Sequence, residues 1–326
     1  MAEKDVSIET YFENKDRIAD LCNVFILHGK RLFLANNIQD RGSRNFLPNN
    51  EIGKKRTIEI NKDIVYEAGI QMKTTIVALE NQSDIHYAMP VRVMSGDSAN
   101  YHNQWTKIKK NHGEKKDLKG AEFLSGFSKG DKLIPAATIV VYLGEEEWDG
   151  PRCLKDMLDL DGLPQELIDF IVDYPMYLLE VRKYEDTELF ETDMRLVFGF
   201  LQRDTDENRL NEYILQNKEE FCNLAEDAFD VICNFSKVKY LVDHKKVYKT
   251  ETGGMDMCKA LDDMVRHGEE RGEKRGEKRG LDRGIEGLIK ICQELGMSVE
   301  LVVQKIMLQF AFSEDKATEY IQKYWN

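Results

Sequence analysis

An α/β fold is predicted for this chain of 326 residues by two recurring patterns. The continuous apolar run LIPAATIVVYLG, residues 133–144, is typical of a strand inside a sheet that is covered on both faces. Helical spacing of apolar residues, as at Ile18, Leu21, Cys22 and Phe25, predicts helices that pack against such a sheet. A chain of this length is expected to form one large domain or two ordinary ones.

The order of the predicted elements follows from apolar spacing and from turn-forming residues. A loop is expected over 35–56, since this segment is rich in turn formers and lacks an apolar period. The other expected elements are a helix within 9–28, strands at 59–68 and 73–82, a helix at 89–110, the strand at 133–144, a helix opening at Pro151, a strand within 174–184 and helices from 188 to 262.

The composition changes at residue 267. Glycine recurs at every fourth position from Gly268 to Gly284, and glycine costs about 1 kcal/mol per helical position relative to alanine. We interpret this segment as a solvated tether or weak helix, with an RNA-binding or self-associating segment as the alternative. Beyond it, an apolar stripe with Ser298 and Ser313 as N-caps predicts a compact helical tail. Association with a partner or with another copy of the chain is the leading role for this tail, and a DNA-reading helix-turn-helix is the weaker one because no basic recognition helix is present.

The composition also restricts the class of protein. A formal net charge of −13 gives no general support for nucleic-acid binding, so any such site must be locally basic or bridged by metal. Six cysteines lack the short spacings of zinc modules, and the apolar neighbours of Cys22, Cys233 and Cys292 predict reduced, buried thiols. No apolar run reaches the roughly 20 residues of a membrane span. The acidic start MAEKDVSIETYF is unlike a secretory signal, so the cytoplasm is the expected location.

Carboxylates on the two short predicted strands suggest a metal site. Asp63 lies in the first strand and Glu80 near the end of the second, where Gln82 shares its side because side chains alternate along a strand. Mg²⁺ prefers oxygen ligands, and carboxylates on adjacent strands would hold it where it polarises a phosphate and activates water. Asp20, on the first helix, is a candidate outer ligand. Spacing alone leaves two readings open, a metal site and the more common solvated strand end.

Longer stretches of the chain resemble a known family. The chain is similar to the recombination-promoting nuclease/putative transposase family in the segments ALENQSDIHYAMPVR, DRIADLCN, FLSGF, IPAATIVVYLG, EEWDGPRCLKDML and GFLQ, and in the tail GLIKICQELGMS. That family belongs to the PD-(D/E)xK nuclease superfamily. The resemblance covers nearly the whole chain.

The resemblance implies a restriction-endonuclease-like αβββαβ core with a helical C-terminal extension, which cuts DNA with Mg²⁺ or Mn²⁺. Asp63 and Glu80 match the metal carboxylates of the family, and Gln82 takes the position that is lysine in the wider superfamily. Family members often have arginine before the aspartate, where this chain has Lys62. The expected parts are a nuclease core at 1–187, a helical region at 188–265, the tether at 266–284 and the tail at 285–326.

The replacement of lysine by Gln82 has a chemical consequence. An amide orients water or phosphate through hydrogen bonds but supplies no charge, so the metal and other cations must provide more of the electrostatic stabilisation. Arg92 and Lys62 are candidates for that charge. His86 and Tyr101 are further secondary candidates, although a structural role is the more common one for each.

A lysine run is the best candidate for contact with a DNA backbone. Residues 107–120 hold six lysines against two carboxylates, and lysine clusters neutralise phosphates without reading base sequence. The alternative is a solvated loop. The lysines predicted to contact DNA are Lys107, Lys109, Lys110, Lys115 and Lys116.

The function implied by the resemblance is that of a metal-dependent DNA endonuclease linked to recombination or mobile elements. The alternative is a catalytically inactive protein, derived from a mobile element, that acts through homo-oligomerisation of its tail. The net charge of −13 and the missing motif lysine favour this alternative in part. Strand transfer, which can use the same metal chemistry, is a third and weaker reading.

Overall fold

Helices and strands are both present in the computed structural model, which describes residues 3–41, 44–51, 54–61, 64–70, 73–236 and 238–325. The chain divides into two compact units, Met1–Cys258 and Lys259–Asn326. The first unit is built around a five-stranded sheet with many helices, which confirms the predicted α/β class. In the described part of the chain, no helix has the length and apolar character that crossing a membrane requires.

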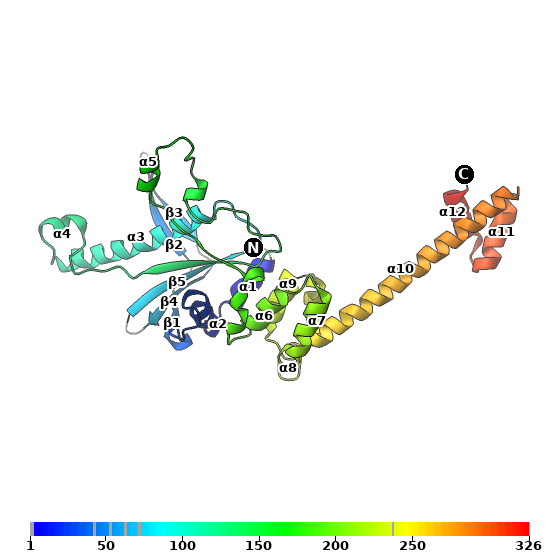
Figure 1. Cartoon of the computed structure of the whole chain (residues 1–326), viewed down its shortest axis with the longest axis horizontal. Helices are drawn as coiled ribbons and strands as arrows, with labels where there is room; N and C mark the ends of the chain where they lie inside the picture. Colours follow the sequence, from blue (N-terminus) through cyan, green and yellow to red (C-terminus); the bar gives the residue numbers. More distant parts are fainter. Residues whose placement is uncertain are drawn as a thin grey trace. The chain divides into compact units, whose positions relative to one another are not determined.

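Five strands in the order β1-β4-β5-β6-β7 form the main sheet (Figure 1). β1, β4 and β5 are antiparallel neighbours, whereas β5, β6 and β7 run parallel. β6 lies between two strands and is buried over most of its length, so the strand predicted at 133–144 is confirmed, as is the one within 174–184. The strands span Ile38–Asp40, Ile64–Ile70, Lys73–Gln82, Ala136–Tyr142 and Tyr177–Glu180.

A separate two-stranded sheet joins β2 (Arg44–Glu51) to β3 (Lys54–Asn61) in an antiparallel register. The loop predicted at 35–56 is therefore wrong over much of its length. The polar sequence RNFLPNNE lacks the apolar alternation that marks a half-buried strand. Backbone pairing between the two strands defines this hairpin, and apolar spacing carries no signal for β2.

The parallel pairing of β5 with β6 requires a crossover connection, which contains α3 (Met89–Lys115). Val93 on α3 packs in one cluster with Val140 on β6, so the helix covers this face of the sheet. The helix predicted at 89–110 is confirmed and is longer than expected. Figure 1 shows α3 extending beyond the strands, with α4 (Gly120–Ser125) at its far end.

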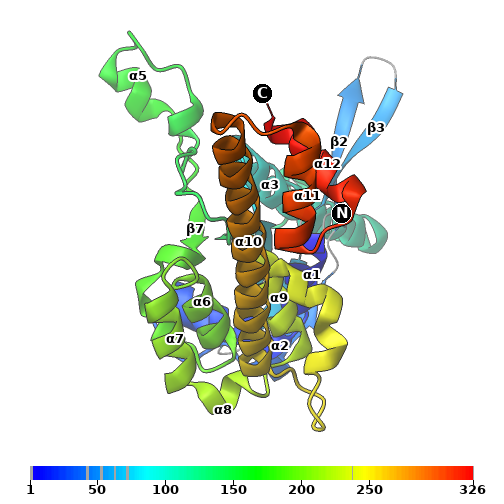
Figure 2. The ribbon, with the colours of Figure 1, turned by 90° about the vertical axis from the view of Figure 1, so that its right-hand side faces the viewer.

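The helices α6 to α9 gather around the N-terminal helices α1 and α2, whereas α5 lies apart from them (Figure 2). α1 contacts both α9 and β5, and α6 packs on α9 (Figure 2). The helix predicted within 9–28 is divided among α1, α2 and a π-helical turn at Cys22–Ile26, and the helices predicted from 188 onward are confirmed. The α-helices span Glu3–Tyr11 (α1), Lys15–Leu21 (α2), Gln165–Phe170 (α5), Met194–Leu201 (α6), Glu207–Gln216 (α7), Lys218–Phe221 (α8) and Glu226–Phe235 (α9). Short 3₁₀ helices lie at Ala35–Asn37, Lys155–Met157, Val181–Lys183, Glu185–Leu189 and Lys239–Tyr248.

The helix predicted to open at Pro151 is wrong. The Asp156 carboxylate accepts hydrogen bonds from the backbone N–H groups of Arg152 and Cys153, at 2.8 and 3.1 Å. These bonds close a turn. The segment then forms only a short 3₁₀ helix, Lys155–Met157. A side chain that bonds to nearby backbone groups in this way competes with helix formation.

The second unit contains most of α10 and all of α11 and α12, which span Met257–Glu294, Val299–Phe310 and Glu314–Tyr324. α10 is continuous through the glycine-rich segment, so the structure has a helix where a tether or weak helix was predicted. Ser298 and Ser313 are the N-caps of the next two helices, as predicted. Ile289, Ile306 and Ile321 belong to the core that these three helices share.

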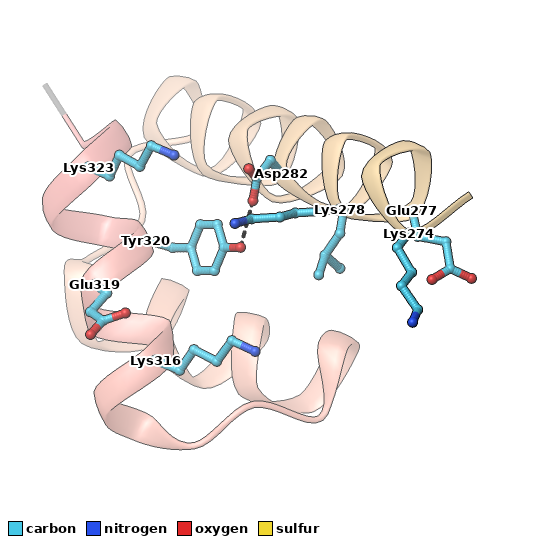
Figure 3. Close-up of a pocket in the computed structure, with 9 residues that line it drawn as sticks. Lys274, Glu277, Lys278, Asp282, Lys316, Glu319, Tyr320 and Lys323 are labelled. Atoms are coloured by element: carbon cyan, nitrogen blue, oxygen red, sulfur yellow. Dashed lines mark hydrogen bonds between the residues drawn. The ribbon is translucent and has the colours of Figure 1, made fainter. Parts of the chain in front are cut away.

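A cleft of about 760 Å³ lies between α10 and α12 within the second unit (Figure 3). Tyr320 projects into it and donates a hydrogen bond to Asp282 at 2.6 Å. Four lysines line the cleft together with three carboxylates, so its charges nearly balance. The cleft is therefore not a strongly basic surface of the kind that a DNA-reading tail requires.

A buried arginine connects the N-terminal helices to α6 and α9. Arg17 of α2 is 3% exposed and forms ion pairs with Asp193 at 2.7 Å and with Asp227 at 2.5 Å. Its guanidinium lies 3.8 Å from the centroid of the Tyr11 ring at the end of α1. Because Asp193 precedes α6 and Asp227 lies in α9, one side chain joins four helices.

We expect Arg17→Met to lower the free energy of unfolding by about 3–5 kcal/mol, because Asp193 and Asp227 would lose their shared cation in a partly buried position. Urea unfolding followed by circular dichroism measures this decrease. Arg41→Met is the matched control, since the Arg41–Glu67 pair is more exposed and is worth about 0–1 kcal/mol. Equal decreases in the two variants would contradict the role assigned to Arg17.

Candidate active site

The predicted carboxylate Glu80 lies near the end of β5, where it neighbours the parallel strand β6. It is 1% exposed, and its register partner on β6 is Val140. Val140 packs with α3, so Glu80 lies on the face of the sheet that α3 covers. A carboxylate in such a position is stable only with compensating partners, because burial disfavours its charged form.

Arg92, in the first turns of α3, is a cationic partner of Glu80. Its Nη2 lies 2.8 Å from Glu80 Oε2, and the arginine side chain is still partly exposed. The ion pair therefore connects a buried strand end to the solvent through a guanidinium. Arg92 is one of the two residues predicted to supply positive charge. In the structure this charge pairs with the Glu80 carboxylate.

Gln82 shares the side of Glu80, two residues further along the strand. Its Nε2 donates a hydrogen bond to the backbone carbonyl of Asn81 at 2.8 Å. The Gln82 side chain thus folds back on its own strand, while the Asn81 side chain is buried. Glu80 and the Asn81 carbonyl offer oxygen atoms within two consecutive residues.

The second predicted metal carboxylate, Asp63, lies outside the described residues, as does Lys62 before it. The residue that follows, Ile64, pairs with Leu79, and Leu79 precedes Glu80. The metal role of Asp63 stays a prediction. Mutation of Asp63 alongside Glu80 tests that role.

Asp20, the predicted outer ligand, has both carboxylate oxygens engaged by protein donors. Oδ1 accepts from Arg31 at 2.6 Å, and Oδ2 accepts from the backbone N–H of Glu191 and from both the N–H and the hydroxyl of Thr192, at 2.8 to 2.9 Å. These bonds hold α2 against the segment that precedes α6. The metal role of Asp20 stays a prediction. Metal binding there would require at least one of these donors to give up its hydrogen bond to the carboxylate.

Of the two secondary candidates, His86 precedes α3 and Tyr101 lies within it. The His86 carbonyl accepts from the N–H of Met89 at the start of α3, and its Nδ1 is buried without a hydrogen-bond partner among the described residues. The Tyr101 hydroxyl accepts from the N–H of Ala136 at 3.0 Å, which docks α3 onto the start of β6. Tyr101 therefore has a structural contact, in keeping with the more common role of such a residue.

Asp97 is a buried acid on the inward side of α3 that was not among the predicted site residues. Thr138 on β6 donates to its Oδ1 at 2.6 Å, and the Tyr174 hydroxyl donates to its Oδ2 at 2.5 Å. Burial and the hydrogen bond to Asp97 raise the pKa of Tyr174 well above its ordinary value. The signal was present in the sequence, because Asp97 lies four residues after Val93 on the inward side of the helix.

The predicted DNA-contacting lysines lie on the far half of α3 and at its C-cap, and all five are exposed. The helix, which was predicted only as far as residue 110, carries most of the run. Lys109 lies over the ring of Trp105, 5.5 Å from its centroid, and Lys110 lies 4.0 Å from Glu114. The solvated-loop alternative for 107–120 is thus wrong for the part of the run within α3, whereas DNA contact stays a prediction.

His112 anchors the chain that follows the lysine run. Its Nδ1 lies 2.7 Å from Asp117 and its Nε2 lies 2.9 Å from Asp131. The hydrogen bonds to Asp117 and Asp131 raise the pKa of His112 above its ordinary value of 6.5. The charged imidazole carries a proton on each nitrogen, so it satisfies both carboxylates at once.

Comparison with known proteins identifies the family of this chain. A family model described as "Putative transposase, YhgA-like" matches residues 59–228, which is just over half of the chain. The chain therefore belongs to this family, a member of the PD-(D/E)xK nuclease superfamily, and the resemblance found in the sequence is confirmed. The matched region includes β5, α3 and β6 with Glu80 and Arg92. Searches of curated proteins and of solved structures found no match for this chain.

The raised pKa of His112 predicts that its contacts stabilise the fold below pH 6.5 and lose this effect as the pH rises through the folded-state pKa. We expect amide exchange in residues 116–131 to accelerate over that interval, and NMR titration of the His112 ring gives the pKa itself. In the double variant Asp117→Asn, Asp131→Asn, the pKa should fall towards 6.5. An unchanged pKa in that variant would contradict this account.

Proposed function

We propose that this protein is a metal-dependent DNA endonuclease that hydrolyses phosphodiester bonds. Membership in a transposase-like family supports a function related to mobile elements and to DNA. The observation that carries the finer proposal is Glu80, a carboxylate 1% exposed near the end of a strand and paired with Arg92. Burial of an acid at such a point is costly, and a catalytic or metal-binding role is a physical reason to retain it.

The topology supports a restriction-endonuclease-like core. An N-terminal helix, the antiparallel strands β1, β4 and β5, the crossover helix α3 and the parallel strand β6 follow the order αβββαβ, with the β2–β3 hairpin as an insertion. In this order Glu80 lies on the third core strand and Ile64 opens the second.

The donor atoms near the end of β5 fit Mg²⁺ or Mn²⁺. The Glu80 carboxylate and the Asn81 carbonyl are hard oxygen donors, and Asp63 would add a second carboxylate. When bound, the cation would supply Lewis acidity towards a phosphate oxygen and a lowered pKa for coordinated water. Binding there requires Arg92 to share or release Glu80.

The side chains around Glu80 have separate roles in this proposal. Gln82 orients water or the scissile phosphate by hydrogen bonds once its amide leaves the Asn81 carbonyl. Arg92 stabilises the negative charge that develops on phosphate, a role that falls to lysine elsewhere in the superfamily. Because the Arg92 guanidinium is partly exposed, it can leave the Glu80 carboxylate and bind a phosphate of the DNA instead.

The lysine run would hold the DNA backbone at a distance from the cut. Lys107 lies 15 residues after Arg92 on one helix, which corresponds to roughly 22 Å of helix rise. That length spans about six to seven base-pair steps of B-DNA at about 3.4 Å each. One duplex could therefore contact both the site and the lysines.

The deciding experiment is plasmid nicking with Mg²⁺. We expect Glu80→Ala and Asp63→Ala each to lower the rate by about a hundredfold or more, since a catalytic metal supplies several kcal/mol and 1.36 kcal/mol is a factor of ten. Glu67→Ala is the matched control, because Glu67 is a carboxylate on the neighbouring strand β4 that pairs with Arg41. Chelation of the metal should abolish nicking by the wild type.

Equal activity in wild type and in both variants would contradict the site assignment. Absence of both nicking and Mg²⁺ binding, together with an oligomer that disappears on truncation after Asp263, would favour the interaction protein instead. One observation keeps that alternative in view: several large apolar side chains of the tail stay exposed, namely Ile291, Leu295, Leu301 and Leu308.

The lysine run gives a second test that does not depend on cleavage. We expect replacement of Lys107, Lys109 and Lys110 by alanine to weaken DNA binding about equally for all sequences. The dependence of affinity on salt should also flatten, by a slope of about 0.9 for each phosphate that is no longer neutralised. Fluorescence anisotropy at several salt concentrations measures both effects. Alanine at Lys30 and Lys73, two exposed lysines elsewhere, should leave the slope unchanged. Identical slopes in wild type and the triple variant would exclude the run as a DNA-binding surface.

A further inference from the structure

Two cysteines that are 36 positions apart in the sequence meet in the first unit, away from the site at Glu80. Cys222 follows α8, and Cys258 lies in the first turn of α10. Their sulfur atoms are 3.1 Å apart. A carboxylate oxygen of Asp256 lies within 4.8 Å of both sulfurs, and all three side chains are half-buried.

The backbone holds these three residues in place. The N–H and carbonyl groups of Leu224 and Met255 form two reciprocal hydrogen bonds, at 2.9 and 2.7 Å, and both residues are buried. The N–H of Asp256 donates to the carbonyl of Tyr248 at 2.7 Å. Cys222 is two residues before one partner of this bridge, and Cys258 is three residues after the other. The isolated backbone bridge between Leu224 and Met255 therefore holds the segments that carry Cys222 and Asp256 side by side.

We propose that Cys222, Asp256 and Cys258 bind a soft divalent cation, with zinc as the preferred ion. Thiolates and a carboxylate are common zinc ligands in proteins. The Lys218 carbonyl, 3.8 Å from the Cys258 sulfur, or a water molecule would complete four-coordination. Binding would displace the thiol protons and leave both cysteines as thiolates.

The distances allow this coordination with a small adjustment. Zinc–sulfur bonds of about 2.3 Å in tetrahedral geometry place two sulfurs about 3.8 Å apart, so the observed 3.1 Å must widen by roughly 0.7 Å. Rotation of the two cysteine side chains can provide that change. The Leu224–Met255 bridge can stay in place while this happens.

A disulfide is the competing use of two neighbouring cysteines. Both cysteines are free, and their sulfur atoms are 3.1 Å apart, whereas a disulfide bond needs about 2.05 Å. The Asp256 carboxylate beside both sulfurs is a further donor to a cation and has no role in a disulfide. A bound cation offsets the repulsion among two thiolates and a carboxylate, so it can draw the same three groups together.

This site differs chemically from the one near the end of β5. Oxygen donors near Glu80 favour a hard cation, whereas two sulfurs favour a soft one. The inference does not rest on the proposed nuclease activity. Its test can therefore succeed or fail whether or not the protein cuts DNA.

The experiment uses the full-length protein, reduced and freed of metal by a chelator, and titrates it with Co²⁺. We expect one equivalent of Co²⁺ to produce a thiolate-to-cobalt charge-transfer band that Zn²⁺ then removes. Cys222→Ser and Cys258→Ser should each abolish the band, and Asp256→Asn should weaken Co²⁺ binding about tenfold or more, since even outer partners of metal ligands are worth 10–100-fold. Cys153→Ser, at another half-buried free cysteine, and Glu80→Ala should both retain the band.

Absence of the band in the wild type would overturn the proposal, as would a band that survives in both serine variants. A Cys222–Cys258 disulfide that forms on air exposure in a protein without Co²⁺ binding would overturn it in favour of redox chemistry. Should a serine variant fail to fold, alkylation of the wild type decides instead. Mass spectrometry should then show Zn²⁺ protecting Cys222 and Cys258 from iodoacetamide while Cys153 stays reactive, and equal reactivity of all three would contradict the site.

Discussion

The parallel pairing of β5 with β6 is the constraint on which the first unit depends. Parallel neighbours cannot be joined by a tight hairpin, so the chain must cross over the sheet, and α3 is the helix of that crossover. The first turns of α3 place Arg92 2.8 Å from Glu80. Its last turns carry the lysine run and hold His112 between two carboxylates. One topological requirement therefore positions both the buried charge of the candidate site and the exposed charge beyond it.

Buried ionic groups in this unit are each compensated by specific partners. Glu80 is paired with Arg92, Arg17 lies between two aspartates, and Asp20 accepts four hydrogen bonds. Such pairs contribute little net stability but make removal of one partner costly. The net charge of −13 is consequently a poor guide to any single site. The donor atoms at each site indicate which ion it could bind. Oxygen donors lie near the end of β5, and the sulfur donors are Cys222 after α8 and Cys258 in the first turn of α10.

Apolar periodicity predicted the elements that bury apolar side chains and failed for those that do not. β6, α3 and the tail helices were found because their cores repeat at the strand or helix period. β2 was missed because its polar sequence shows no such period. The helix expected at Pro151 failed because the Asp156 side chain bonds to the neighbouring backbone, a contact that spacing does not reveal.

By itself, the sequence determined the α/β class, the family and the placement of Glu80 and Gln82 on one side of a strand, since alternation along a strand is a local property. Only the tertiary structure decided which partner each group meets. It paired Arg92 with Glu80, inserted Asp97 between Thr138 and Tyr174, and brought Cys222 to Cys258 across 36 positions. Such contacts join segments far apart in the chain, and their geometry depends on how the whole core packs.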